Sequence, residues 1–174
     1  GSLVIFGVII LPLSFLSDFI NSKRKKLLDQ QSWQASHDGL TGCINRRAGL
    51  QLLEKKIEDS KTLGQIYALL FIDVDHLSHI NNSYGHAIGD KTLIKICERI
   101  KKSIRSNDDL IRMGGDEFIV SLNNIGSPDN ASNVAKKILN SCNITLPFEN
   151  TIVPLSVSIG IAVTSPKTNI SNEK

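Results

Sequence analysis

Two adjacent glycines followed by two adjacent carboxylates, Gly114, Gly115, Asp116 and Glu117, are the residues of this sequence best suited to chemistry. Glycine adopts positive φ angles and, having no Cβ, lets a bulky anion approach the backbone. Carboxylate oxygens are ligands that Mg²⁺ prefers, and Mg²⁺ often binds together with phosphates. The pattern favours a nucleotide site, and a solvated turn without a ligand is the alternative.

A second acidic pair follows a continuous apolar run. Residues 66–72 are apolar and lead directly into Asp73, which predicts an interior strand covered on both faces. Side chains of a strand alternate, so Asp73 and Asp75 should project together from its end. The glycines lie between two further apolar runs, which predicts a β-hairpin over residues 110–122. Asp73 and Asp116 converge only if this strand and the hairpin are neighbours.

The elements that must position these acids follow from the spacing of apolar residues. A turn-rich segment, residues 36–42, precedes the first helix, and Gly85 and Gly89 indicate a loop. The order of elements predicts an α+β domain, an α/β sandwich whose mixed, partly antiparallel central sheet is flanked by helices. The predicted helices are residues 46–60, 76–84, 91–104 and 131–142, a turn is expected at 127–130, and the last strand is 153–163.

Composition excludes several classes of protein. The chain has 174 residues, 41% hydrophobic and 21% charged, as expected for one globular domain with a short appendage. The net charge of +3 includes the four adjacent basic residues 23–26, so the remainder is slightly acidic and no nucleic-acid-binding surface is indicated. The three cysteines are widely spaced beside apolar residues, which favours reduced core thiols over a disulfide framework. His76 and His79 are one helical turn apart, which raises a zinc site as an alternative that we disfavour.

The N-terminal region suggests a membrane anchor. Residues 3–20 are strongly apolar and would span about 27 Å as a helix, close to the thickness of a bilayer core. Basic residues directly follow this run, which predicts a membrane span with its C-terminal side in the cytoplasm. A buried N-terminal helix is the alternative. The chain begins Gly-Ser without methionine, so we expect a piece of a longer membrane protein, with residues 1–22 as the end of a transmembrane helix, 23–36 as a linker helix and 37–174 as the main domain.

Four motifs occur in order along the chain: Asp-Gly-Leu-Thr-Gly at 38–42 with Asn-Arg-Arg at 45–47, Phe-Ile-Asp-Val-Asp-His at 71–76, Ile-Asn-Asn-Ser-Tyr-Gly-His at 80–86 with Gly-Asp at 89–90, and Arg-Met-Gly-Gly-Asp-Glu-Phe at 112–118. Together they resemble the GGDEF domain of diguanylate cyclases over roughly residues 35–164. The resemblance implies a palm-like fold similar to class III nucleotidyl cyclases and condensation of two GTP molecules into cyclic di-GMP with release of two pyrophosphates. One monomer would hold one GTP, so a homodimer is implied, with the domain on the cytoplasmic side of a bacterial inner membrane.

The resemblance assigns catalytic and metal-binding roles. Asp73, the backbone carbonyl of Val74, and Asp116 would hold Mg²⁺, or Mn²⁺ in its place, on the triphosphate. Asp116 would also be the base for the ribose 3′-hydroxyl, and Glu117 would support the acidic cluster.

It also assigns substrate contacts. Asn81 and Asp90 would read the guanine edge, because a carboxylate accepts hydrogen bonds from N1 and the 2-amino group. The remaining substrate contacts implied by the resemblance are His76, Leu77, Gly114 and Gly115, whose glycine backbone would lie against the phosphates.

Two further pairs come from the same comparison of motifs. Asp38 would form a buried ion pair with Arg112. Arg105 and Asp108 match the Arg-x-x-Asp site at which the family binds cyclic di-GMP as a product inhibitor, and arginine can grip a phosphate or a guanine edge through two hydrogen bonds.

Two departures from the family leave alternatives open. Ser78 stands where the family usually has a lysine that neutralises phosphate charge, and the family's C-terminal helix and strand do not follow residue 163, so we expect a domain lacking both. A catalytically weak or inactive module that binds cyclic di-GMP or GTP is therefore the alternative to a cyclase. A cyclase that makes cyclic AMP or cyclic GMP is disfavoured by the hairpin and by the guanine-reading pair.

Overall fold

The computed structural model describes residues 13–148 and 151–164 and divides the chain into two units, residues 1–35 and 36–174. In the first unit, α1 (Leu13–Ser36) contains the predicted linker helix of residues 23–36. No helix in the described part of the chain is long and apolar enough to span a bilayer. Most of the predicted membrane span, residues 1–12, lies outside the described residues and stays a prediction.

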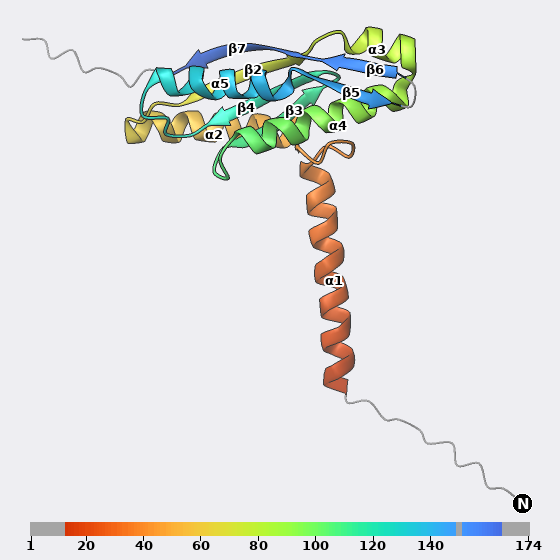
Figure 1. Ribbon diagram of the computed structural model, residues 1–174. Helices are drawn as coiled ribbons and strands as arrows, with labels where there is room; N and C mark the ends of the chain where they lie inside the picture. The colour runs from red at the N-terminus through yellow and green to blue at the C-terminus, as the bar shows by residue number, and fades with distance from the viewer. Residues whose placement is uncertain (1–12, 149–150, 165–174) are drawn as a thin grey trace, which may run out of the picture. The chain divides into compact units, whose positions relative to one another are not determined.

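A five-stranded sheet forms the centre of the second unit (Figure 1). The first two strands in spatial order are parallel, and the remaining neighbours are antiparallel, which confirms the predicted mixed sheet. In spatial order the strands are β1 (Ile44–Asn45), β3 (Asp109–Gly114), β4 (Glu117–Leu122), β2 (Ala68–Val74) and β7 (Val157–Val163).

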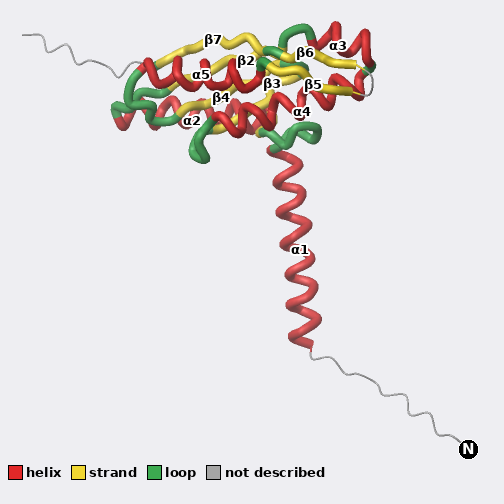
Figure 2. The backbone as a smooth tube through the Cα atoms, viewed as in Figure 1, coloured by secondary structure: helices red, strands yellow, loops and turns green. Residues whose placement is uncertain are grey.

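Helices lie on both faces of this sheet (Figure 2). On one face, α2 (Arg46–Leu63) packs on β1 and β3, where Gly49 allows contact with Ile111 and Lys56 forms an ion pair with Asp109. The opposite face carries the larger apolar core, which is made with α3 (Leu77–Tyr84), α4 (His86–Ser103), α5 (Pro128–Cys142) and a two-stranded sheet of β5 (Ile144–Phe148) and β6 (Thr151–Leu155).

One part of the sheet is open, contrary to the prediction of a strand covered on both faces. Ala68, Leu70, Ile72 and Val74 are buried in the larger core, but Phe71 on the opposite face is 48% exposed. The reason is that α2 packs on the far strands, β1 and β3, and leaves this face of β2 and β7 uncovered within the described residues.

Three sequence predictions about elements were wrong in detail. Gly89 lies inside α4 and not in a loop, because it packs against the side chain of Asn81. The expected turn at 127–130 is the start of α5, where Pro128 takes the first helical position. The expected strand at 153–163 is two strands, β6 and β7. The preceding strand, β5, was not predicted because Pro147 and Pro154 are unfavourable in the interior of a sheet. Both strands of a two-stranded sheet are edges, where proline is tolerated.

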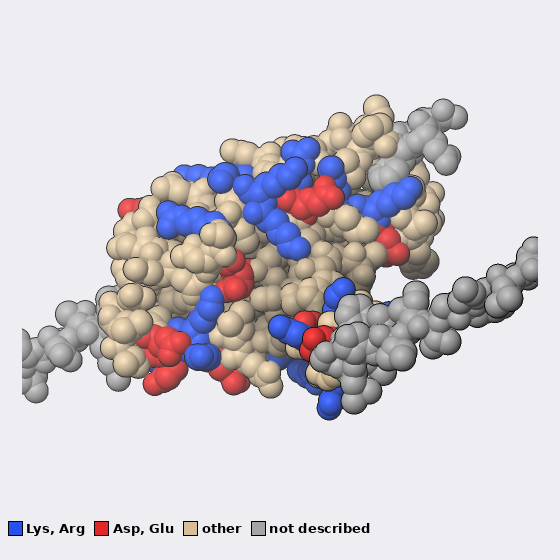
Figure 3. Space-filling model, turned by 90° about the horizontal axis from the view of Figure 1, so that it is seen from below, with Lys and Arg blue, Asp and Glu red and all other residues tan. Residues whose placement is uncertain are grey.

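Charged side chains are mixed in sign on the face shown in Figure 3, where lysines and arginines lie among carboxylates. Lys95 and Glu98, and Lys61 and Glu58, form exposed pairs three residues apart on α4 and α2. Such pairs contribute little to stability.

Candidate functional site

The tip of the β3–β4 hairpin carries the glycine and carboxylate cluster, as predicted. Gly114 has φ 147° and Gly115 has φ 51°, conformations that favour glycine. Gly114 pairs with Glu117, and the register shifts between Arg112 and Gly114, which leaves Gly115 and Asp116 as the turn. The two glycines are therefore required by the backbone of this turn.

The strand pairing brings the two acidic segments together. β2 and β4 are neighbours, with Asp73 opposite Glu117, and the Val74 amide donates a hydrogen bond to the Asp116 carbonyl oxygen at 3.1 Å. The strand that ends at Asp73 and the hairpin that carries Asp116 are therefore neighbours, as convergence of the two acids requires.

The electrostatics of this cluster favour a cation. Although Asp73 is exposed, partial desolvation raises its pKa, and the carboxylates of Asp116, Asp75 and Glu117 raise it further. Within the described ranges, no group of three or more histidines, cysteines, aspartates or glutamates is arranged to hold a metal by itself. Carboxylates that repel one another are stabilised by a cation between them. They suit Mg²⁺, which typically binds one or two carboxylates together with substrate phosphates and water.

Asp75 has a structural partner that the sequence reasoning missed. The hydroxyls of Ser156 and Ser158 donate hydrogen bonds to its carboxylate at 2.6 and 2.7 Å, and its amide donates to the Ser156 carbonyl at 3.1 Å. These bonds fix the start of β7 beside the end of β2. The signal in the sequence was the pair of serines two residues apart.

A cavity of about 570 Å³ lies over the open face of the sheet and reaches the acidic cluster. Its walls include Asp73 and Glu117, the exposed ring of Phe71, and Arg46 at the start of α2. Arg46 adds a positive charge to a cavity wall that also contains two carboxylates. Neither Arg46 nor Phe71 was singled out from the sequence as a site residue.

The predicted guanine-reading residues lie on two helices in close contact. A Cβ added to Gly89 of α4 would lie 1.8 Å from the Asn81 Oδ1 of α3, so only glycine allows this approach. Asp90 follows Gly89 directly, so the turn of α4 that carries Asp90 lies against Asn81. His76 precedes α3 in a left-handed conformation, φ 59°, and the Leu77 side chain is buried, so Leu77 could meet a ligand only through its backbone.

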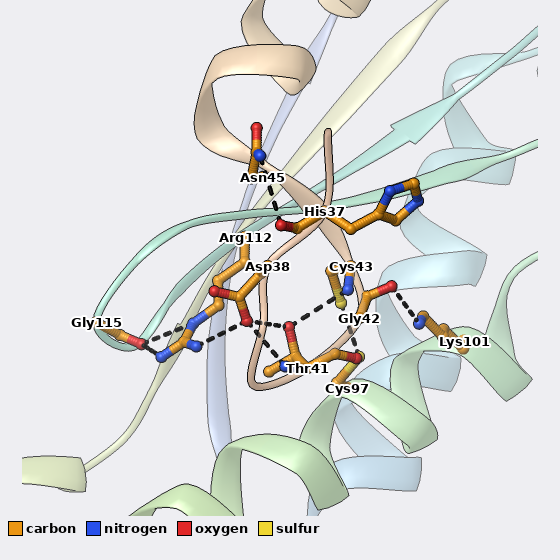
Figure 4. A network of polar contacts seen from close by, with 10 residues as sticks. All are labelled: His37, Asp38, Thr41, Gly42, Cys43, Asn45, Cys97, Lys101, Arg112 and Gly115. Atoms are coloured by element: carbon orange, nitrogen blue, oxygen red, sulfur yellow. Dashed lines mark hydrogen bonds and ion pairs between the residues drawn. The ribbon is translucent and has the colours of Figure 1, made fainter. Parts of the chain in front are cut away.

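The contact between Asp38 and Arg112 is present and partly exposed (Figure 4). Arg112 Nη1 donates to Asp38 Oδ1 at 2.9 Å, and its Nη2 donates to the Gly115 carbonyl at 2.8 Å. The Thr41 amide and hydroxyl also donate to Asp38 Oδ1, at 2.9 and 2.6 Å. Although burial opposes it, the hydrogen bonds from Thr41 and Arg112 lower the pKa of Asp38. Residues 38–43, which we name the N-terminal turn, are thereby tied to the hairpin tip.

Arg105 and Asp108 lie together in the turn between α4 and β3. The Arg105 amide donates to Asp108 Oδ2 at 3.0 Å, and the Asn123 amide donates to Asp108 Oδ1 at 3.3 Å. A cavity of about 320 Å³ next to this turn is lined by both residues together with His37 and Lys101. The structure thus brings the predicted inhibitory pair into one cavity wall.

Comparison with known proteins gives consistent results. The family model for "Diguanylate cyclase, GGDEF domain" matches residues 35–174. Diguanylate cyclase TpbB of Pseudomonas aeruginosa is 35% identical over 152 residues, which is 85% of this chain and 35% of TpbB, so the chain spans about a third of that relative. The solved GGDEF domain of TpbB is 36% identical with a TM-score of 0.70, covering 73% of this chain and 74% of that domain.

A third similarity concerns the fold alone. The coiled coil and GGDEF domain of DgcB from Caulobacter crescentus, solved in complex with c-di-GMP, superimposes with a TM-score of 0.79 at 23% identity. The match covers 88% of this chain and 82% of that one.

Proposed function

Because the chain belongs to the GGDEF family of diguanylate cyclases, we propose that it condenses two GTP molecules into cyclic di-GMP. Two copies of the domain, each holding one GTP, would face each other. The 3′-oxygen of each GTP would attack the α-phosphate of the other, and two pyrophosphates would leave.

The observation that supports this proposal most directly is the pairing of β2 with β4. It brings Asp73, Asp116 and Glu117 to one edge of the sheet, next to a glycine turn whose backbone is open to phosphates. A cluster of mutually repelling carboxylates is expected where a metal-bound triphosphate is to be held.

In the proposed reaction the residues of this chain have distinct roles. Asp116 accepts the proton of the 3′-hydroxyl, and Glu117 supports the charge of the cluster. Asp73, Asp116 and the Val74 carbonyl would hold Mg²⁺, which when bound neutralises the charge of the phosphates. Asn81 and Asp90 orient the guanine, so that most of the rate gain comes from positioning.

The test is turnover of GTP by the purified chain, followed by chromatography of the nucleotides. We expect cyclic di-GMP to form with Mg²⁺ at a rate that rises faster than linearly with protein concentration, as a dimer requires. Asp116→Ala should reduce the rate by about 100-fold or more. Glu54→Gln, which removes an exposed carboxylate of α2, is the control and should retain the rate.

A second function is favoured by Ser78. This residue is exposed on α3 and stands where the resemblance expects a lysine, so phosphate binding lacks one positive charge. The domain would then act as a receptor for cyclic di-GMP or GTP. Tight nucleotide binding with no product, even at high protein concentration, would establish this function in place of the cyclase.

Product feedback is part of the proposal. Cyclic di-GMP would bind at Arg105 and Asp108, where the guanidinium can grip a phosphate or a guanine edge. Arg105→Ala should abolish product inhibition and spare the initial rate. An unchanged inhibition curve would remove this role from Arg105.

A further inference from the structure

Two cysteine thiols that take no part in the proposed reaction lie in contact within the network of Figure 4. The Sγ atoms of Cys43 and Cys97 are 2.7 Å apart, although the residues are 54 positions apart in the sequence. Both side chains are buried, with 1% and 2% exposed, and both are reduced. Cys43 ends the N-terminal turn, and Cys97 lies in α4.

We propose that Cys43 and Cys97 are a site of reversible oxidation, at which a peroxide joins them in a disulfide that fastens the N-terminal turn to α4. This proposal is independent of the reaction that the domain catalyses. It rests on the placement of the two thiols and on the contacts that already hold the turn.

The backbone needs little movement to form the bond. A disulfide has an S–S distance of about 2.05 Å, so the two sulfurs must approach by less than one ångström from their present separation. The turn already lies against α4, because Lys101 Nζ donates to the Gly42 carbonyl at 3.2 Å and Cys97 Sγ lies 3.5 Å from the Thr41 carbonyl oxygen.

The surroundings make Cys43 the reactive thiol of the pair. Its hydrogen bond with Cys97 lowers the pKa of Cys43, against the effect of burial, and Thr41 and the nearby Lys101 act in the same direction. The same contact raises the pKa of Cys97. Cys43 and Lys101 are among the residues that line the 320 Å³ cavity, so in this proposal the cavity is the route by which a small oxidant approaches the buried pair.

The chemistry balances with hydrogen peroxide as the oxidant. The Cys43 thiolate attacks one peroxide oxygen, the O–O bond breaks, and a sulfenic acid and hydroxide form; the hydroxide takes up the proton that the Cys43 thiol had lost and becomes water. The Cys97 sulfur then attacks the Cys43 sulfur, the S–O bond of the sulfenic acid breaks, and the departing hydroxyl takes the Cys97 thiol proton to leave as a second water. Two electrons pass from the thiols to the peroxide, and a dithiol reductant reverses the reaction.

The disulfide would measurably increase the stability of the domain. It closes a loop of more than fifty residues, which restricts the unfolded chain and stabilises the folded one. We expect the melting temperature to rise by roughly 5 to 15 °C on oxidation. The gain should be lost when a dithiol is added.

The experiment is thiol counting on the whole chain. After peroxide treatment, denaturation and alkylation with N-ethylmaleimide, we expect one adduct per chain in place of three, and a protein mass lower by about 2 Da before alkylation. Digestion should yield one linked peptide that contains Cys43 and Cys97. Cys142 is the internal control. Burial raises its pKa to about 11, so it should stay a free thiol during oxidation and be alkylated after denaturation.

Variants distinguish the pair from other thiol chemistry. Cys142→Ala should leave the disulfide unchanged, and Cys43→Ala and Cys97→Ala should each prevent it. Three alkylated thiols after oxidation, a link through Cys142, or a sulfinic acid at Cys43 in place of the link would each overturn the proposal. Counting in the unsubstituted chain decides the matter even if an alanine variant fails to fold.

Discussion

Replacing Gly89 with alanine would test the close contact between α3 and α4. An added Cβ would lie 1.8 Å from Asn81 Oδ1 and 2.9 Å from its Cγ, distances that real side chains do not reach. Asn81 must therefore rotate away. The backbone of α4 is helical at residue 89, so alanine itself is acceptable there.

The substitution should affect GTP binding more than the stability of the domain. Alanine gains about 1 kcal/mol over glycine in a helix, and a displaced Asn81 costs about 0.5 to 1.5 kcal/mol in rotamer energy. The free energy of unfolding should therefore change by less than about 1 kcal/mol. Loss of one hydrogen bond to guanine costs about 0.5 to 1.5 kcal/mol, which raises the Kd for GTP roughly 2- to 13-fold.

Isothermal titration with GTP and thermal unfolding measure the two quantities. Asn81→Ala should raise the Kd by a similar factor, and combining it with Gly89→Ala should add little, because both remove the same contact. Gly49→Ala is a matched control, since its Cβ would lie 2.3 Å from Ile111 Cγ2 in the core. It should destabilise the domain by about 1 to 3 kcal/mol and leave the Kd unchanged. An unchanged Kd in Gly89→Ala, or effects that add fully, would refute the guanine-reading role of Asn81.

Three further predictions concern charge. Partial desolvation and neighbouring carboxylates raise the pKa of Asp73, so wild-type stability falls as pH rises through that pKa. Asp73→Asn should melt higher than wild type at pH 7, with the gain shrinking in acid, and equal melting at pH 7 would contradict this. Hydrogen bonds from Thr41 and Arg112 lower the pKa of Asp38 despite its burial, so its contribution is present at pH 7 and is lost as pH falls through the lowered pKa. Asp38→Ala should cost about 2 kcal/mol in denaturant unfolding at pH 7 and less in acid, and a pH-independent cost would exclude the ion pair as the cause. Ser78→Lys should lower the Kd for GTP by roughly 3-fold at low salt, and an equal effect of Ser78→Gln would show that charge is not responsible.

The local parts of the site could be predicted from the sequence. Gly114 and Gly115 between two apolar runs specify a hairpin turn, because positive φ angles and flanking strands are both encoded nearby. The convergence of Asp73 with Asp116 depended on which strands pair. Strand pairing is a property of the whole sheet and cannot be predicted from local sequence, so the convergence of the two acids could be established only from the structure.

Other features depend on contacts between distant segments. Gly89 reads as a loop residue unless the position of Asn81 is known, and the partner of Asp75 comes from β7, more than eighty positions away. Phe71 looked buried because its strand is uniformly apolar. Its exposure reflects where α2 packs, which periodicity does not determine.

Arg112 has a consequence for how the domain opens. Its guanidinium binds the Asp38 carboxylate and the Gly115 carbonyl at the same time, so both segments are held by one side chain. We therefore expect the N-terminal turn and the hairpin tip to open together, in one cooperative event with one free energy. In hydrogen exchange, the Thr41 amide, which is bonded to Asp38, should become unprotected together with the Val74 amide, which is bonded to Asp116. Arg112→Ala should let the two amides exchange at separate rates.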